Sequence, residues 1–267
     1  MKVKIKSARF AASLLVLAGV ISGAGAIAQT AAPAAAAAPE PDFTFAYNIG
    51  VVTDYRFRSI SQTSFDPAVQ GGFDFTHKNG FYAGVWASNI KWIKEYVGAK
   101  DGSLEIDLYL GYKGEISKDF TYDVGAITYQ YPGNKAAEVA GFANANTTEI
   151  YGALTYGVFT AKYSYAVSDF IANANSSGSN YFEVAAAVDL GNGLTLTPHI
   201  GRQSVSNVPG SKGDYTDYSL ALTKDFGNGV AVTGTLIGTD ADDVFYGDVK
   251  GRKLGKNTVT LGVKYSF

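Results

Sequence analysis

The chain has 267 residues, with 22 basic and 24 acidic side chains and no cysteine, so it can form neither a disulfide framework nor a thiolate metal site. The formal net charge of −2 lacks the basic excess that a nucleic-acid-binding protein needs. After the first 28 residues no apolar run of about twenty residues occurs, which argues against a helical membrane protein. Eighteen Tyr, sixteen Phe and thirty-one Gly favour a β-barrel instead.

The amino terminus has the pattern of an export signal. Four basic residues within the first nine positions precede an uncharged run over residues 10–20 and the small-residue sequence Ala26-Ile27-Ala28. This pattern predicts a signal peptide over residues 1–28, since the strongly apolar part is too short for a transmembrane anchor. Its cleavage removes four of the 22 basic residues and leaves 18 against 24 acidic ones, a net charge of −6.

Residues 29–42 are rich in Ala and Pro, and we interpret them as a periplasmic leader with nothing to bury. From Phe43 to Phe267 the chain has the alternation of extended strands. The last strand shows it most clearly, because residues 257–267 place five apolar side chains on one face and small or polar ones on the other, and end on an aromatic residue. A strand of about ten residues with an apolar face toward lipid and a polar face toward a lumen is the repeating unit of outer-membrane barrels.

Twelve such strands are predicted, within bounds of 10 to 14. They cover residues 43–51, 68–77, 81–92, 103–113, 120–131, 147–156, 159–167, 180–190, 194–203, 215–225, 230–239 and 257–267. Long connections alternate strictly with short ones, as in bacterial barrels with short periplasmic turns and longer extracellular loops. The sequence therefore predicts an all-β fold, a transmembrane antiparallel up-and-down β-barrel over residues 43–267.

Three strands depart from a simple pattern. The alternation of the first strand continues past Val51, which places Tyr55 and Phe57 on the outer face and Asp54, Arg56 and Arg58 on the inner face. In the third strand Tyr82, Trp86, Ile90 and Trp92 compete with Val85 for the outer face, and the two tryptophans suggest positions at the membrane interface. In the ninth strand Pro198 argues against a regular central ladder.

A family resemblance covers about fifty residues at the start of the barrel. The run N-I-G-V-V-T-D-Y-R-F-R-S-I-S-Q-T over residues 48–63 is followed by P-A-V-Q-G-G-F-D-F over 67–75 and G-F-Y-A-G-V-W-A-S-N-I over 80–90. These motifs resemble the TorF-type family of outer-membrane porins, the Gcw_chp family of uncharacterised bacterial barrel proteins. The resemblance implies a barrel, with a pore as a further expectation, and it supplies no catalytic residues.

Strand parity places an acidic excess on the inner face. The inward acids are Asp74, Glu105, Asp107, Asp123, Glu149, Glu183 and Asp217, against Lys113, Lys162 and Lys264, with His199 also inward. If water fills the lumen, this excess predicts a weak preference for cations. The alternative is that the acids pair with inward Lys and Arg and plug the lumen.

Arg56 and Arg58 form the sharpest polar cluster. We expect both guanidinium groups to face the upper lumen opposite carboxylates and to form a charged constriction. Alternatively they lie at the headgroup level, where they bind lipopolysaccharide phosphates or end the strand.

Other polar groups give weaker signals. Asp240, Asp242 and Asp243 share one loop, but they lack the spacing, the Gly and the distal Glu of a calcium site, so a solvated acidic loop is expected. The two histidines are interpreted as a turn residue (His77) and a polar lumen residue (His199). Neither a G-x-S-x-G nor an H-E-x-x-H motif occurs, so we expect no enzyme and no cofactor.

The sequence thus predicts a porin-like channel of a Gram-negative outer membrane for passive diffusion of small hydrophilic solutes. The alternatives are an occluded structural or adhesive barrel and, less favoured, an outer-membrane hydrolase. The expected partners are outer-membrane lipid and lipopolysaccharide, the barrel-assembly machinery through the strand that ends at Phe267, and the solutes themselves, with no nucleic acid.

Overall fold

The computed structural model describes residues 41–267, so the predicted signal peptide and most of the predicted leader lie outside the described residues. The strands are β1 (Phe43–Val52), β2 (Arg56–Phe57), β3 (Ile60–Ser61), β4 (Ala68–His77), β5 (Phe81–Asn89), β6 (Leu104–Ser117), β7 (Phe120–Gln130), β8 (Thr147–Tyr156), β9 (Phe159–Ala166), β10 (Asn180–Ala186), β11 (Val188–Gly191), β12 (Leu194–Ser204), β13 (Tyr215–Asp225), β14 (Val230–Thr239) and β15 (Thr258–Ser266). The helices are α1 (Trp92–Glu95) and the 3₁₀ turns η1 (Ala136–Glu138) and η2 (Pro209–Ser211).

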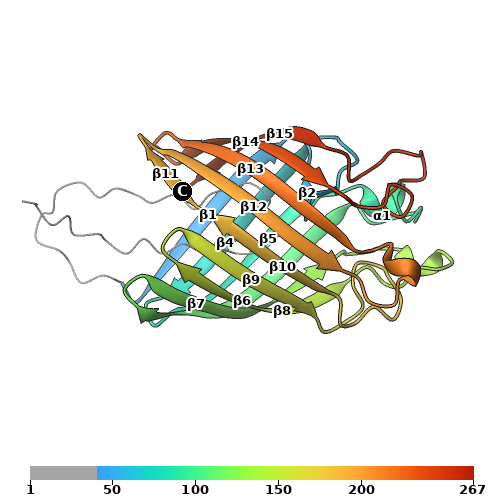
Figure 1. Ribbon diagram of the computed structural model, residues 1–267, viewed down its shortest axis with the longest axis horizontal. Helices are drawn as coiled ribbons and strands as arrows, with labels where there is room; N and C mark the ends of the chain where they lie inside the picture. The colour runs from blue at the N-terminus through green and yellow to red at the C-terminus, as the bar shows by residue number, and fades with distance from the viewer. Residues whose placement is uncertain (1–40) are drawn as a thin grey trace, which may run out of the picture.

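All strand segments except β2 and β3 form one closed antiparallel barrel (Figure 1). Along the wall each strand pairs antiparallel with the next wall strand in the sequence, and β1 pairs with β15 from Asn48↔Ser266 to Val52↔Gly262 to close the wall. Thirteen segments make up this sheet, but β10 and β11 both pair with β12 and count as one interrupted strand. The predicted twelve-stranded antiparallel barrel is therefore confirmed.

The connections are sorted by length between the two ends of the barrel. The loops of residues 53–67, 90–103, 131–146, 167–179, 205–214 and 240–257 belong to one end, which we call the loop end. The turns of residues 78–80, 118–119, 157–158, 192–193 and 226–229 belong to the other, the turn end. The carboxyl terminus lies at the turn end, and α1 lies among the loops (Figure 1).

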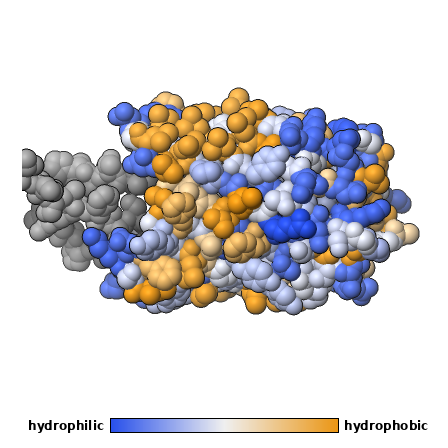
Figure 2. Space-filling model, in the orientation of Figure 1, coloured by the Kyte–Doolittle hydropathy of each residue, from blue (hydrophilic) through white to orange (hydrophobic). Residues whose placement is uncertain are grey.

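The outer face of the wall is apolar because every second residue of each strand points away from the lumen. Phe45 and Leu110, for example, are 51% and 54% exposed. Figure 2 shows apolar residues over the wall toward the turn end and hydrophilic ones over the loop end. Among residues 41–267 there is no helix long and apolar enough to span a membrane.

The irregularity expected at Pro198 is present in the structure. β10 pairs with β12 as far as Ala185↔His199, and β11 resumes the pairing at Val188↔Leu196. Pro198 lies opposite the break between these two segments, where a missing backbone N–H costs no ladder hydrogen bond. On its other side it stays in register with Leu220 of β13.

The prediction that the first strand runs on to Arg58 is wrong. β1 ends at Val52, and residues 53–67, which we call the lumen hairpin, leave the wall and fold into the barrel around the short β2–β3 pair. Tyr55 and Phe57 are therefore not on the outer face but 2% and 7% exposed. Apolar and polar residues continue to alternate beyond the end of β1 because the lumen hairpin also has one apolar side and one polar side.

The third strand was also misread. Tyr82, Trp86, Ile90 and Trp92 are all buried, so they belong to the interior and not to the membrane interface. Trp86 packs edge-on against Tyr55 of the lumen hairpin, with 5.3 Å between ring centroids. Large apolar side chains are accommodated on the inner face because the hairpin supplies a hydrophobic surface there.

Candidate functional site

The lumen hairpin is organised around the buried carboxylate of Asp54. This carboxylate accepts hydrogen bonds from Arg56 Nε at 2.6 Å, Ser61 Oγ at 2.6 Å and Thr63 Oγ1 at 3.3 Å. Arg56 also donates from Nη1 to the carbonyl oxygens of Ser59 and Leu254, both at 2.9 Å. Arg56 thus holds the hairpin together and attaches it to loop 240–257.

Arg58 lies at the tip of the hairpin and reaches the opposite wall. Its Nη2 donates to Glu149 Oε2 of β8 at 2.7 Å, and its Nη1 donates to Gln203 Oε1 of β12 at 2.7 Å. The guanidinium carbon lies 4.3 Å from the centroid of the Tyr181 ring and 4.7 Å from that of Phe57. Ion pair, amide contact and cation–π contacts together fix this one side chain.

Further hydrogen bonds attach the tip to β13. Ser59 Oγ donates to Asp217 Oδ1 at 3.0 Å, and Tyr215 Oη donates to the carbonyl oxygen of Arg58 at 2.9 Å. Tyr181 Oη occupies the other oxygen of Asp217 at 2.8 Å. The hairpin therefore starts between β1 and β4 and is bonded to β8, β12 and β13, so that it spans the lumen.

Carboxyl groups crowd the lumen beside the hairpin. Tyr55 Oη donates to Glu105 Oε1 at 3.1 Å, and Asp107 follows on the same face of β6. Glu105, Asp107 and Glu149 are each no more than 3% exposed, and one oxygen atom of each has no hydrogen-bond partner among residues 41–267. This is where the acidic excess of the lumen is concentrated.

A second polar group lies nearer the turn end. Asp123 accepts a hydrogen bond from Tyr82 Oη at 2.6 Å and lies 3.6 Å from Lys113 Nζ. Asp74 accepts from Tyr109 Oη at 2.5 Å. Two further lysines face inward here: Lys162 lies over the Tyr151 ring at 4.3 Å, and Lys264 lies on the inner face of β15.

The histidines have the surroundings of structural residues. His199 Nε2 lies 3.1 Å from Glu183 Oε2 and 3.3 Å from Tyr181 Oη, and its Nδ1 is 3.7 Å from Asp217. His77 accepts the backbone N–H of Asn79 in the turn after β4. Within the described part of the chain, no serine hydroxyl is hydrogen-bonded to either histidine, so the geometry of a Ser-His pair is not found there.

The three aspartates of loop 240–257 that are close in sequence all have partners within the protein. Asp240 accepts the Thr216 N–H at 2.6 Å, Asp242 accepts the N–H groups of Val244 and Phe245, and Asp243 pairs with Lys253. Across residues 41–267, no group of three or more His, Asp or Glu side chains is arranged to hold a metal ion.

The acids and lysines that strand parity assigns to the inner face all lie on that face in the structure. It brings Arg58 against Glu149 as a cross-lumen pair, whereas Arg56 pairs with Asp54 inside the hairpin. Strand parity placed Asp54 on the inner face without giving it a role, and sequence reasoning missed Gln203, Tyr181 and Tyr215. One feature of the sequence could have located Tyr181, namely an inward-facing glycine on the neighbouring strand. A Cβ atom on Gly201 of β12 would lie 2.0 Å from Tyr181 Oη, so the tyrosine side chain lies across β12 at a position where only glycine leaves room for it.

These features define a class, the closed twelve-stranded antiparallel β-barrels whose lumen is narrowed by an inserted loop. Within that class, the chain belongs to the Gcw_chp family, described as bacterial protein of unknown function, whose sequence model matches residues 35–267. No curated protein matches the chain in sequence.

Solved porins share the fold. The KdgM porin aligns with a TM-score of 0.50 at 7% identity and covers 84% of this chain and 98% of its own. The NanC porin aligns with a TM-score of 0.51 at 11% identity and covers 84% and 99%. A KdgM porin in complex with disordered oligogalacturonate aligns with a TM-score of 0.50 at 7% identity and covers 84% and 98%. At these identities the likeness extends to the fold alone.

Proposed function

We propose that the protein is a porin-like channel of the Gram-negative outer membrane that passes small hydrophilic solutes by passive diffusion, with the lumen hairpin as its constriction. The observation that carries this proposal is the anchoring of the hairpin across a charged lumen by Arg58, Glu149 and Gln203. A closed barrel with an apolar outer wall suits a bilayer, with the turn end periplasmic and the loop end outside. The motifs of residues 48–90, which resemble those of the TorF-type porins, support this proposal.

The charges of the lumen support a weak preference for cations. Glu149 pairs with Arg58 and Asp123 lies near Lys113, whereas Asp74, which accepts a hydrogen bond from Tyr109, has no ion pair among the described residues. An uncompensated acidic group lowers the energy of a cation in a narrow, low-dielectric passage. The KdgM porin has been solved with oligogalacturonate, a polyanion. The acidic excess of the present lumen favours a different class of solute.

The two arginines have different roles in this channel. Arg58 sets the width, because its side chain bridges the lumen from the hairpin to β8 and β12. Arg56 sets the shape of the hairpin through Asp54 and through the Leu254 carbonyl. This replaces the expectation of two equivalent guanidinium groups on one extended strand.

One observation favours a second candidate, an occluded structural or adhesive barrel. Beside the hairpin the interior is filled by buried aromatic rings, among them Tyr55, Phe57, Trp86, Tyr129 and Tyr131. If this packing leaves no continuous water path, the barrel conducts nothing and its loops carry the function. We propose no catalytic activity and no cofactor for either the channel or the occluded barrel.

Three partners follow from the same proposal. Membrane lipid would contact the outer wall, and lipopolysaccharide would contact its loop end. The barrel-assembly machinery would recognise the last strand, where Phe267 stacks on Tyr47 and Tyr265 with ring centroids 5.7 and 5.6 Å apart. Backbone hydrogen bonds between Phe267 and Tyr47 in both directions fix this terminus at the closure of the barrel.

Single-channel recording tests the proposal. Refolded mature protein in a planar bilayer should give discrete current steps, and a salt gradient should give a reversal potential of cation-selective sign. Replacing residues 55–64 with a short Gly-Ser linker should raise the conductance several-fold, while the same replacement of residues 135–144, which keeps Tyr131, should leave it unchanged. If the native protein and the linker variant both insert as heat-modifiable barrels but carry no current, the channel proposal is rejected and the occluded barrel is supported.

A further inference from the structure

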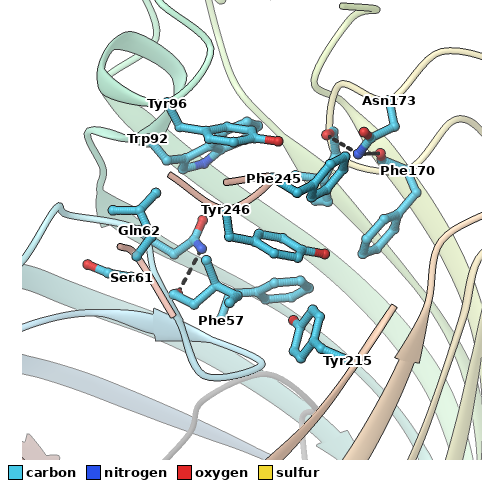
Figure 3. Close-up of a pocket in the computed structure, with 13 residues that line it drawn as sticks. Phe57, Ser61, Gln62, Trp92, Tyr96, Phe170, Asn173, Tyr215, Phe245 and Tyr246 are labelled. Carbon is cyan, nitrogen blue, oxygen red and sulfur yellow. Dashed lines mark hydrogen bonds between the residues drawn. The ribbon is translucent and has the colours of Figure 1, made fainter. Parts of the chain in front are cut away.

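A cavity lies at the loop end, outside the charged part of the lumen (Figure 3). It is lined by residues of the lumen hairpin, of α1 with its C-cap residue Tyr96, and of loops 167–179 and 240–257, and by Tyr215. Segments from four of the six long connections thus converge on one space. Its lining is mostly aromatic and aliphatic, and no Lys, Arg, Asp or Glu side chain takes part in it.

The polar groups of the lining are nearly all engaged in the fold. Ser61 donates to Asp54, Gln62 Nε2 donates to the Ile60 carbonyl, and Asn173 Nδ2 donates to the carbonyl of Phe170. The hydroxyl groups of the two other lining tyrosines donate to the carbonyl oxygens of residues 58 and 213. A ligand with several hydroxyl groups would therefore lose its hydrogen bonds to water without replacement.

One accessible donor remains. The Tyr96 hydroxyl has no hydrogen-bond partner among residues 41–267, and Figure 3 shows it pointing across the cavity toward Phe245. Burial raises the pKa of Tyr96 to about 12, so the group is a neutral hydroxyl over the physiological range. The buried indole N–H of Trp92, on the same side, also lacks a partner within the described part of the chain.

The size of the cavity limits the ligand. Its volume is about 50 Å³. A single water position takes about 10–15 Å³ and a site for benzene about 150 Å³, so there is room for roughly four non-hydrogen atoms but not for a six-membered ring. The absence of an ionised side chain from the lining disfavours a charged ligand, because a buried charge without a partner is costly.

From these four observations we infer that the loop-end cavity is a binding site for a small, uncharged, mostly apolar molecule with one hydrogen-bond acceptor, such as a short ketone, held by the Tyr96 hydroxyl. This site goes beyond the proposed passage of hydrophilic solutes. The ligand would contact the lumen hairpin directly, since Phe57 and Gln62 belong to the lining.

The two tryptophans of the chain allow a direct test. Trp92 lines the cavity, whereas Trp86 is absent from the lining and packs against Tyr55. In the refolded full barrel, two-dimensional NMR shows two indole N–H signals, which a Trp86→Phe variant assigns. If that variant does not fold, a Trp92→Phe variant assigns them instead. Acetone, which has four non-hydrogen atoms and one acceptor, is the probe.

Titration with acetone should move the Trp92 signal saturably, with a millimolar dissociation constant, and leave the Trp86 signal in place. Tyr96→Phe should weaken binding about five-fold, the effect of one hydrogen bond. Tyr163→Phe, the same change on the exposed outer wall, should have no effect.

Three results would overturn the inference: a shift that does not saturate or is shared by both tryptophans, equal binding by the Tyr96 and Tyr163 variants, or an equal response to glycerol or to acetophenone. Because the readout needs no ionic current, its failure is distinguishable from a failure of the channel proposal.

Discussion

Arg58 and Glu149 are 91 positions apart in the chain and form a 2.7 Å ion pair across the lumen, with side chains 5% and 1% exposed. The pair connects the tip of the lumen hairpin to β8, a strand far around the barrel from β1 and β4. It is therefore the contact that most directly fixes the hairpin inside the lumen. Buried pairs of this kind are sensitive to the loss of one partner, because the remaining charge is left without compensation.

Glu149→Gln should destabilise the barrel and release the hairpin. We expect a loss of about 3 kcal/mol, since keeping Arg58 buried without its counter-charge is costly and this cost favours release of the hairpin. Urea unfolding of the refolded protein measures the loss, and single-channel recording should show a higher conductance. Replacing both partners, as Arg58→Met with Glu149→Gln, should recover part of the stability. Glu115→Gln, on an exposed residue, is the control, and an equal effect at both positions would contradict the assignment.

Tyr215→Phe tests the second attachment of the hairpin tip. The Tyr215 hydroxyl donates to the Arg58 carbonyl at 2.9 Å in a buried setting, so its removal leaves a carbonyl unpaired. The expected cost is about 1–3 kcal/mol. Tyr218→Phe makes the same chemical change on a residue that is 50% exposed, and it should cost less than about 0.5 kcal/mol. Unfolding curves that shift equally for both variants would show that the hydrogen bond contributes nothing.

The wall of the barrel could be predicted from the sequence because strand parity is a local property. Leu108 and Leu110 face out and Asp107 and Tyr109 face in for a reason visible in their spacing alone. Parity also put Glu149 on the inner face. It could not supply the partner, because pairing with Arg58 depends on how a loop from the other side of the barrel folds.

The lumen hairpin could not be predicted for a similar reason. Arg58 and Ser59 have φ values of 46° and 67°, a conformation for which the sequence offers no Gly or Asn signal. Three hydrogen bonds to Asp54 and the contacts with the opposite wall stabilise this backbone, and all of them exist only in the folded barrel. The alternation over residues 53–57 was real, but it marked the two sides of a hairpin inside the lumen.

Charge selectivity should respond to two inward residues of opposite sign. Lys264→Gln removes a positive charge from the inner face of β15 and should increase the cation preference, whereas Asp74→Asn should decrease it. Reversal potentials in a salt gradient measure both, and the two shifts should have opposite signs. Lys78→Gln, an exposed lysine in a turn, is the control. Shifts of the same sign, or none, would remove these residues from the ion path.

Loop 240–257 should open in acid. Glu95, the last residue of α1, contacts Lys250 at 3.2 Å and Arg252, and Arg252 Nε is 2.6 Å from Asp248, so loop 240–257 is held by two carboxylates. Burial alone would raise the pKa of Glu95, but hydrogen bonds and the charges of Lys250 and Arg252 outweigh it and lower that pKa. The pKa of Asp248 is likewise lowered, because bonds to Arg252 and to backbone N–H groups outweigh burial.

A lowered folded-state pKa means that these carboxylates stabilise the closed loops above the unfolded pKa of about 4 and lose that effect as the pH falls through the lower folded value. A spin label on Val249→Cys, in a chain without other cysteines, should therefore be restrained at pH 7 and become mobile below about pH 4. With Glu95→Gln added, the label should already be more mobile at pH 7. A label on Asn144→Cys, in loop 131–146, should show no such transition. Equal acid responses at the two labels would mean that the loop end loosens as a whole and that this cluster does not hold loop 240–257.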